Sequence, residues 1–387
     1  MKHGFTYLTC LMTSLVFTTF LTGCQTDRGT VPTGGSSQDD IILGAEYFTT
    51  THPLDPIKTL GRGINMGNYL EAAGKEGAWT GGVLIRQEDF KIIRAAGFTN
   101  VRIPIRWSDH TDTKAPYQID PAFKQRVQEV VDWALAADLK VVINVHHYEE
   151  MMKESKAHLP YHRERLRAIW AQICELFPLS RYSRDQIIFE LLNEPNGTVG
   201  YDEWNQIIAE LTSLIWDKPE QKERKIMVGT ANWGGVHGLE HLRLPERANR
   251  DNTIITIHFY EPFKFTHQGA EWVEGSRQWI GQRWRGTSQD KQELLQLLAA
   301  VEKWNKQGGR NFEIYMGEFG AYGKYTRPAD RRAWTAFVAR EAEKRGMSWA
   351  YWEYSQGFGA YDLAKNEWRP ELIEALIPES AATLQKK

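Results

Sequence analysis

Residues 187–195 read Ile-Ile-Phe-Glu-Leu-Leu-Asn-Glu-Pro. The run begins as an apolar, strand-forming segment and ends in the triplet Asn193-Glu194-Pro195. Because Pro195 has no N–H to donate, it stops the strand. An unpaired charge inside a buried strand is costly, whereas a carboxylate at the strand's exit is free to meet a ligand. We therefore interpret Glu194 as a candidate catalytic acid at the end of a buried strand.

A second stretch repeats this pattern. Residues 312–320 read Phe-Glu-Ile-Tyr-Met-Gly-Glu-Phe-Gly, a short hydrophobic strand that leads into Glu318. Either glutamate alone is as well explained by a strand that ends in an exposed acid. Two carboxylates at two strand ends, however, are what acid-assisted displacement at an acetal carbon requires.

The composition of the 387-residue chain excludes some functions and favours others. Forty-seven basic and 49 acidic residues give a formal net charge of −2, so no basic field indicates nucleic-acid binding. The 15 tryptophans are the unusual feature. Most aromatic residues of an enzyme belong to its core, but those in loops offer flat faces to sugar rings.

The N-terminus has the features of a lipoprotein signal. Lys2 and His3 precede an apolar stretch over 5–21 that is short for a membrane span. It ends in Leu-Thr-Gly-Cys at 21–24, which resembles a bacterial lipobox and implies lipidation of Cys24; an ordinary secretory signal is the alternative. By the same resemblance, Gln25 after the cysteine favours the outer membrane of the cell envelope.

These features divide the chain into a signal peptide (1–23), a flexible tether that starts at Cys24 (24–40) and one domain (41–387). The tether is rich in Gly, Ser, Thr, Gln and Asp and cannot bury enough apolar surface to fold. Cys174 is the one cysteine left in the domain, which excludes an intrachain disulfide. It falls on an apolar helical stripe, so we expect it in the core.

Strand and helix patterns alternate through the domain. Strands are expected at 62–66, 101–105, 140–145, 187–192, 225–229, 253–257, 312–316 and 348–351. Helices are expected between them at about 87–96, from 121, 162–177, 201–216, near 239, 290–306 and 329–345, with a last one from 370. Eight such units in one domain predict a single (β/α)8 TIM barrel. The alternative, an open doubly wound sheet, typically has a glycine-rich phosphate turn after its first strand, and this chain has a long loop there instead.

Polar residues collect where the strands end, which is where the active site of such a barrel lies. The set comprises Asn65, Asn68, Glu71, Arg102, Trp107, Asn144, His146, His147, Asn193, Glu194, Asn232, Trp233, His258, Tyr260, Glu318, Trp352 and Glu353. A zinc site from the histidines is the alternative. It is disfavoured because adjacent residues of a strand, such as His146 and His147, point to opposite faces. We expect neither a metal nor a cofactor.

Six motifs resemble glycoside hydrolase family 5 of clan A. They are Val-Arg-Ile-Pro at 101–104, Asn-Val-His-His at 144–147, Leu-Asn-Glu-Pro at 192–195, His-Phe-Tyr at 258–260, Gly-Glu-Phe-Gly at 317–320, and Trp352. They occur in the family's order and span about residues 60–377. The stretches 61–68 and 265–275 resemble more closely the bacterial Cel5A-type endoglucanases, some of which also accept mannan.

This resemblance implies roles for the individual residues. Glu194 would be the acid/base and Glu318 the nucleophile, with Arg102 and Tyr260 holding Glu318 ionised and His258 beside Glu194. Asn193 would bind the sugar 2-hydroxyl. The residues implied to line the sugar subsites are His146, His147, Trp233 and Trp352, with Asn68, Glu71, His267 and Trp272 further out.

The resulting expectation is a retaining endo-β-1,4-glucanase that acts by double displacement, which needs carboxyl groups ~5–5.5 Å apart. The expected partners are β-glucan oligo- and polysaccharides, on a monomer held by a lipid anchor. Two alternatives remain open: a β-mannanase or dual glucanase/mannanase, and a surface lipoprotein that binds glycans without cleaving them.

Overall fold

The computed structural model describes residues 41–55 and 59–379. The predicted signal peptide, the tether and Cys24 lie outside the described residues, so these assignments stay predictions. Within residues 41–55 and 59–379, no helix combines the length and the apolar composition that a membrane span requires.

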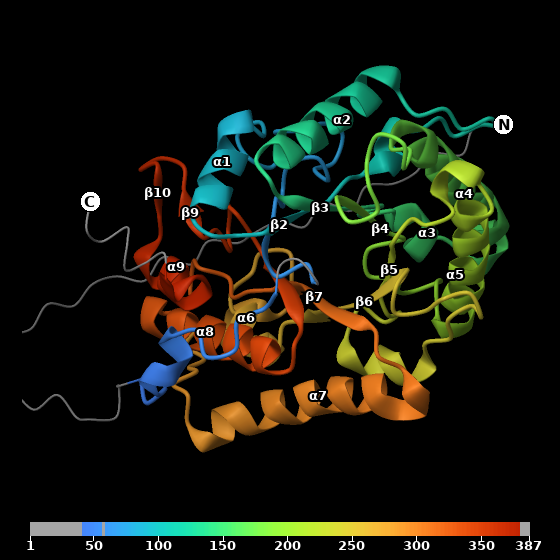
Figure 1. Ribbon diagram of the computed structural model, residues 1–387. Helices are drawn as coiled ribbons and strands as arrows, with labels where there is room; N and C mark the ends of the chain where they lie inside the picture. Colours follow the sequence, from blue (N-terminus) through green and yellow to red (C-terminus); the bar gives the residue numbers. More distant parts are fainter. Residues whose placement is uncertain (1–40, 56–58, 380–387) are drawn as a thin grey trace, which may run out of the picture. The chain divides into compact units, whose positions relative to one another are not determined.

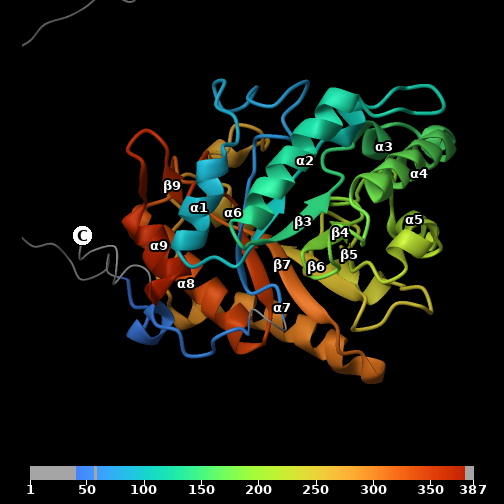
Figure 2. The same cartoon turned by 45° about the horizontal axis from the view of Figure 1, so that its top comes forward.

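Eight parallel strands close into a barrel in sequence order, which confirms the predicted TIM barrel. Helices surround the strands in both views (Figures 1 and 2). The strands are β1 (Arg62–Asn65), β2 (Asn100–Ile103), β3 (Lys140–Asn144), β4 (Ile187–Glu190), β5 (Ile226–Val228), β6 (Thr253–Phe259), β7 (Glu313–Phe319) and β8 (Ser348–Tyr351). A separate hairpin pairs β9 (Tyr361–Asp362) with β10 (Glu367–Trp368).

The helices form where apolar residues recur at helical spacing. In α2 (Pro121–Ala136), the Asp120 side chain caps the N-terminus by accepting from the Ala122 N–H at 2.8 Å, and the predicted apolar face is buried. The others are α1 (Gln87–Ala95), α3 (Glu149–Lys153), α4 (Leu159–Leu176), α5 (Tyr201–Trp216), α6 (Phe263–Thr266), α7 (Ser288–Lys306), α8 (Pro328–Lys344) and α9 (Pro370–Leu376). A 3-10 helix, Val236–His241, follows β5.

The inside of the barrel changes from apolar to polar along the strands. An apolar floor, defined here as Leu60, Val142, Ile188, Met227, Ile254, Tyr315 and Ala350, forms a buried cluster of its own. Because side chains two residues apart face the same way, Glu190 lies above Ile188 on β4. Arg102 and Glu190 therefore form a buried polar layer on top of the floor.

Several elements differ from the sequence prediction. Strand β7 continues to Phe319, so Glu318 lies within the strand, where the β6–β7 and β7–β8 registers both shift. Helix α4 begins at Leu159, three residues early, because Pro160 suits a first helical turn. Helix α3 and the β9–β10 hairpin were not predicted, because segments this short show no periodicity.

Candidate active site

Arg102 on β2 organises the buried polar layer. Its Nε and Nη2 donate to the two carboxylate oxygens of Glu190 on β4, at 2.6 and 2.8 Å. Its Nη1 donates to Glu318 Oε1 at 2.7 Å, and its Nη2 donates to Asn193 Oδ1 at 2.7 Å. Arg102 is completely buried, so its planar donor fork fixes these three acceptors in place.

Glu190 is a residue that sequence reasoning missed. It is 1% exposed and lies inside the apolar run of β4. A charged residue within such a run needs a buried partner. A glutamate inside an apolar strand was therefore the signal in the sequence that could have identified this residue. The partner, Arg102, lies 88 residues earlier in the chain.

Glu318 is held from two sides. Besides the Arg102 bond, Tyr260 Oη donates to its Oε2 at 2.8 Å. Burial raises the pKa of Tyr260 well above its usual value, and the charge of Glu318 adds to this. Tyr260 therefore stays protonated and remains a donor, and two donors stabilise negative charge on Glu318.

Glu194 faces Glu318 from the end of β4. Its backbone leaves the strand with φ of +44°, and its side chain is 26% exposed, against 6% for Glu318. His258 Nδ1 donates to Glu194 Oε1 at 2.7 Å and lies 3.6 Å from Glu318 Oε2. An oxygen of each glutamate and a nitrogen of His258 lie within 4.8 Å of one another.

The two carboxylates favour the protonated form of His258. Burial alone lowers the pKa of His258, but Glu318 and Glu194 outweigh it and raise the pKa above the usual value. In the part of the chain that the structure describes, Glu194, His258 and Glu318 are also the group whose atoms are close enough to hold a metal ion. Each of the three already has a hydrogen-bond partner there.

His146 and His147 follow β3, where the Val145 carbonyl accepts from the N–H of Asn193, the residue before Glu194, at 2.9 Å. The His146 ring stacks on Trp352 with centroids 5.9 Å apart, and Asn144 Nδ2 bonds its Nδ1 at 3.0 Å. The two histidine rings meet edge to face at 4.3 Å. The expectation that they point apart was wrong, because His147 has a φ of +48° and does not continue the strand. Burial lowers the pKa of His146 well below its usual value and that of His147 to about 4, so both are neutral.

Asn68 and Glu71 follow β1. Glu71 is completely buried, and its oxygens accept from the backbone N–H groups of Asn68 and Tyr69. Burial raises the pKa of Glu71 to about 8, although these N–H groups favour its charged form. Glu71 thus supports the turn in which Asn68 has a φ of +73°, and a contact between Glu71 and sugar stays a prediction.

The remaining predicted residues lie on the loops after β5 and β6. Trp233 and Trp272 are 58% and 60% exposed. His267 is nearly buried, stacks on Phe263 at 4.1 Å and meets Trp272 at 6.5 Å. Burial lowers the pKa of His267 to about 4. The two tryptophans therefore offer open ring faces, and His267 is a neutral group in contact with Trp272.

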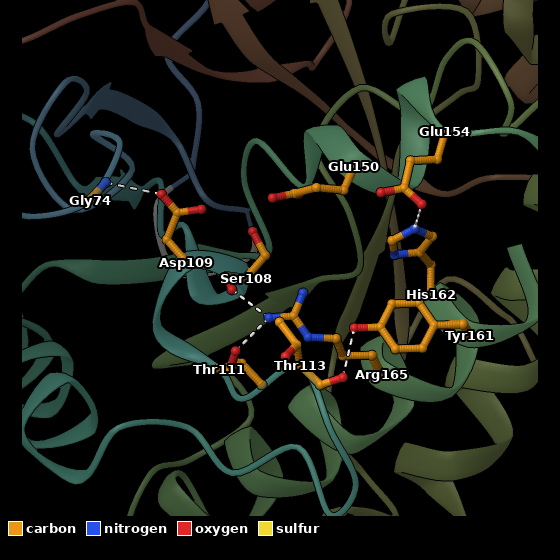
Figure 3. A pocket seen from close by; sticks show the side chains of 10 residues that line it. All are labelled: Gly74, Ser108, Asp109, Thr111, Thr113, Glu150, Glu154, Tyr161, His162 and Arg165. Carbon is orange, nitrogen blue, oxygen red and sulfur yellow. Dashed lines mark hydrogen bonds and ion pairs between the residues drawn. The ribbon is translucent and has the colours of Figure 1, made fainter. Parts of the chain in front are cut away.

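A polar pocket of about 360 Å³ lies apart from the two carboxylates, among the loops after β1, β2 and β3 and the start of α4 (Figure 3). Its polar groups mostly bond to one another. Arg165 donates to the Ser108 and Thr111 carbonyls, and His162 contacts Glu154 at 3.1 Å. The other lining residues are Gly74, Asp109, Thr113, Glu150 and Tyr161.

Cys174, the free cysteine among residues 41–55 and 59–379, is buried as expected, and burial raises its pKa to about 12. A thiol that holds its proton so strongly is a poor nucleophile. Its position therefore agrees with core packing.

Comparison with known proteins adds independent information. The family model described as cellulase (glycosyl hydrolase family 5) matches residues 63–357. Endoglucanase H of Acetivibrio thermocellus is 30% identical over 80% of this chain and 31% of its own length, so the match spans less than a third of that protein. Endoglucanase B of Clostridium cellulovorans is 28% identical over 84% of this chain and 76% of its own length.

Solved structures are similar over the whole barrel. Thermotoga maritima Cel5A in complex with mannotriose is 46% identical, with a TM-score of 0.76 over 83% of this chain and 98% of that one. The cellobiose complex of Thermotoga maritima Cel5A is 47% identical, with the same TM-score and coverage.

Proposed function

The chain belongs to glycosyl hydrolase family 5, and on this premise we propose that it is a retaining endo-β-1,4-glucanase. The observation that carries the proposal is the pair Glu194 and Glu318, with carboxylate oxygens within 4.8 Å of each other. Retaining enzymes place their carboxyl groups ~5–5.5 Å apart, whereas inverting enzymes need ~6.5–9.5 Å to admit a water.

The different surroundings of the two glutamates support different roles. Arg102 and Tyr260 stabilise the charge that a nucleophile needs, so Glu318 attacks the anomeric carbon and forms a glycosyl-enzyme ester. Glu194, which is more exposed and bonds to His258 rather than to Arg102, protonates the departing glycosidic oxygen.

The second half of the reaction uses the same groups. Ionised Glu194 then takes a proton from a water molecule, whose oxygen attacks the anomeric carbon and releases Glu318. Two inversions restore the original configuration. No step in this sequence draws on a metal or a cofactor.

Asn193 is placed to read the sugar next to the cleaved bond. Its Oδ1 accepts from Arg102 at 2.7 Å, which leaves its amide N–H groups as the donors for a bound sugar. We assign this amide to the sugar 2-hydroxyl, whose hydrogen bond strengthens in the transition state.

A glucan is the proposed substrate, because the curated relatives quoted above are named endoglucanases. The test is a panel of carboxymethyl-cellulose, barley glucan, lichenan, glucomannan and mannan with sizing of the products. Internal cleavage of the β-1,4-glucans supports the proposal. Cleavage of mannan alone would reject the glucan assignment in favour of a mannan substrate. Release of single sugars from chain ends would reject the endo assignment in favour of exo action.

Glu318→Ala tests the mechanism. We expect kcat to fall by more than about 10³-fold, because the nucleophile is lost, while oligosaccharide binding is retained. Glu175→Ala, an exposed glutamate on α4, is the matched control and is expected to keep full activity. Activity in Glu318→Ala like that of the wild type would reject the assignment.

We also propose that the enzyme is an outer-membrane lipoprotein that acts as a monomer, anchored through Cys24 by way of the 24–40 tether. The support is the lipobox-like Leu-Thr-Gly-Cys at 21–24. Radioactive palmitate fed to cells should label the wild type and not Cys24→Ala, and an unlabelled wild type would reject the anchor. Light scattering of the detergent-free 41–387 domain tests the monomer.

A further inference from the structure

A row of rings leads outward from the carboxylate pair, and we call it the aromatic row. It runs from Trp352 through His146 and His147 to Trp79. Trp352 stacks on His146 at 5.9 Å, His146 meets His147 at 4.3 Å, and His147 meets Trp79 at 5.7 Å with the ring planes at 66°. Each ring contacts the next, so the row is continuous from the reaction site to the β1–α1 loop.

Trp79 is the open end of this row. Its side chain is 44% exposed, although a large aromatic group gains from burial. His146, in the middle of the row, is 1% exposed. At the inner end of the row, the Trp352 backbone N–H donates to the carbonyl of Phe319, the residue after the nucleophile, at 2.8 Å.

The loop around Trp79 is held in place on both sides. The Gly77 carbonyl accepts from the N–H groups of Thr80 and Gly82, which forms a tight turn around the tryptophan. The Glu76 carboxylate accepts from the Ile85 N–H at 2.8 Å and from Arg126 of α2 at 2.8 and 3.0 Å. A ring presented by a fixed loop loses little entropy when a ligand binds to it.

Trp79 also lies across the barrel from Trp233, whereas Trp272 packs against Tyr322 and Phe358 of the loops after β7 and β8. In a closed barrel with strands in sequence order, the loops after β1 and β5 are on opposite sides. Trp79 follows β1, whereas Trp233 follows β5 and Trp272 follows β6. A linear glycan laid over the carboxylates from Trp233 to the opposite rim would reach the loop that carries Trp79.

We propose that Trp79 is the platform of an additional sugar-binding subsite, which holds a glucosyl unit distant from the cleaved bond. The apolar C–H face of that unit stacks on the exposed indole, as sugars do on aromatic side chains. This inference rests on the proposed function and deepens it, because the subsite makes the enzyme prefer long chains over short oligosaccharides.

The test compares Trp79→Ala, Trp79→Phe and Leu84→Ala on cellohexaose and cellotriose. Leu84 is 47% exposed in the same loop and outside the row, so it is the matched control. Loss of the indole face should raise KM for cellohexaose about tenfold. The expected kcat is that of the wild type, and the change on cellotriose is less than twofold. Trp79→Phe, which keeps a ring, should recover most of the loss, and Leu84→Ala should resemble the wild type.

A binding measurement separates this inference from the proposed function. In the Glu318→Ala background, calorimetry should show that Trp79→Ala weakens cellohexaose binding about tenfold and leaves cellotriose binding unchanged. This result supports the subsite even if the wild type proves to cleave no glucan. Equal effects on both lengths, or none on either, would overturn it. Circular dichroism melting of each variant identifies misfolding as the cause of a uniform loss.

Discussion

Arg102 connects the stability of the barrel to its chemistry. Two of its partners, Glu190 and Glu318, are carboxylates, and two more, Asn65 and Asn193, are amides. Both salt bridges are buried above the apolar floor, where little water screens the charges. Removing one member of such a cluster leaves another charge unpaired, which costs far more than losing a surface pair.

Arg102→Lys tests this connection. Lysine keeps the charge but cannot bind Glu190 with two parallel donors while it also reaches Glu318 and Asn193. We expect kcat to fall by about 10²-fold or more and the free energy of unfolding, measured in urea, to fall by about 3 kcal/mol.

The matched control is Arg181→Lys. Arg181 pairs with Asp132 at 2.9 Å, and its side chain is 60% exposed. This substitution should change the free energy of unfolding by less than about 0.5 kcal/mol. Equal effects of the two substitutions would show that the buried cluster has no special role.

The burial of His267 predicts that the free energy of unfolding falls in acid. Burial lowers its pKa from the usual 6.5 to about 4, so the folded state holds it neutral while the unfolded state takes up a proton below pH 6.5. Its contribution is therefore complete above pH 6.5 and is lost as the pH falls toward 4, by an amount on the order of 3 kcal/mol.

His267→Phe keeps a ring against Phe263 and removes the titrating group. Urea unfolding at pH 7, 6, 5 and 4 should show a weaker loss of stability with acid in this variant than in the wild type. His237→Phe, at an exposed position, is the control and should retain the wild-type slope. A slope in His267→Phe identical to the wild type would refute the assignment.

At the scale of elements, the end of β7 aims the nucleophile. The register of β7 shifts on both sides next to Glu318. The Gly317 carbonyl at this point accepts from Asn65 Nδ2 at 2.9 Å, and Asn65 in turn accepts from Arg102. A Cβ on Gly317 would lie 2.6 Å from Thr256 Oγ1, closer than atoms pack.

Gly317→Ala should therefore displace the strand that carries Glu318. We expect a loss of about 1–3 kcal/mol in unfolding free energy and a fall in kcat. Gly229→Ala faces the same threonine at an ordinary 3.4 Å and should be close to neutral. Calorimetric melting and kinetics measure the stability and kcat of both variants. Equal changes in Gly317→Ala and Gly229→Ala would mean that the clearance at Gly317 is unimportant.

The strands could be predicted from the sequence, and the details at their ends could not. Apolar runs such as 187–192 marked each strand to within a few residues. The extension of β7 to Phe319 was missed, because a register shift depends on neighbouring strands and leaves no periodic signal. Helix α3 has two buried residues, Met151 and Met152, too few to show a pattern.

In the candidate site too, residues marked by a local pattern could be predicted, and residues defined by contacts between distant strands could not. Glu194 and Glu318 stand out because each follows an apolar strand, and the structure places them together. Glu190 did not stand out, because its meaning depends on Arg102, in a strand two places away. Trp79 lies in a glycine-rich loop, and only its contact with His147 connects it to the site.

At the scale of the whole molecule, the closed barrel separates stability from chemistry. The apolar floor fills the lower interior, the Arg102–Glu190 layer covers it, and the loops above carry the residues that meet the substrate. Glu194 and Glu318, 124 residues apart in the sequence, are brought together only when all eight strands close. This closure produces the carboxylate spacing of a retaining glycosidase.

The anomeric configuration of the first product shows whether the two carboxylates act by double displacement. Proton NMR recorded in the first minutes of cellohexaose hydrolysis, before mutarotation, reports which anomer is released. A double displacement by Glu318 and water predicts that the β-anomer appears first and the α-anomer grows only at the rate of mutarotation. Initial release of the α-anomer would contradict a double displacement by Glu318 and water.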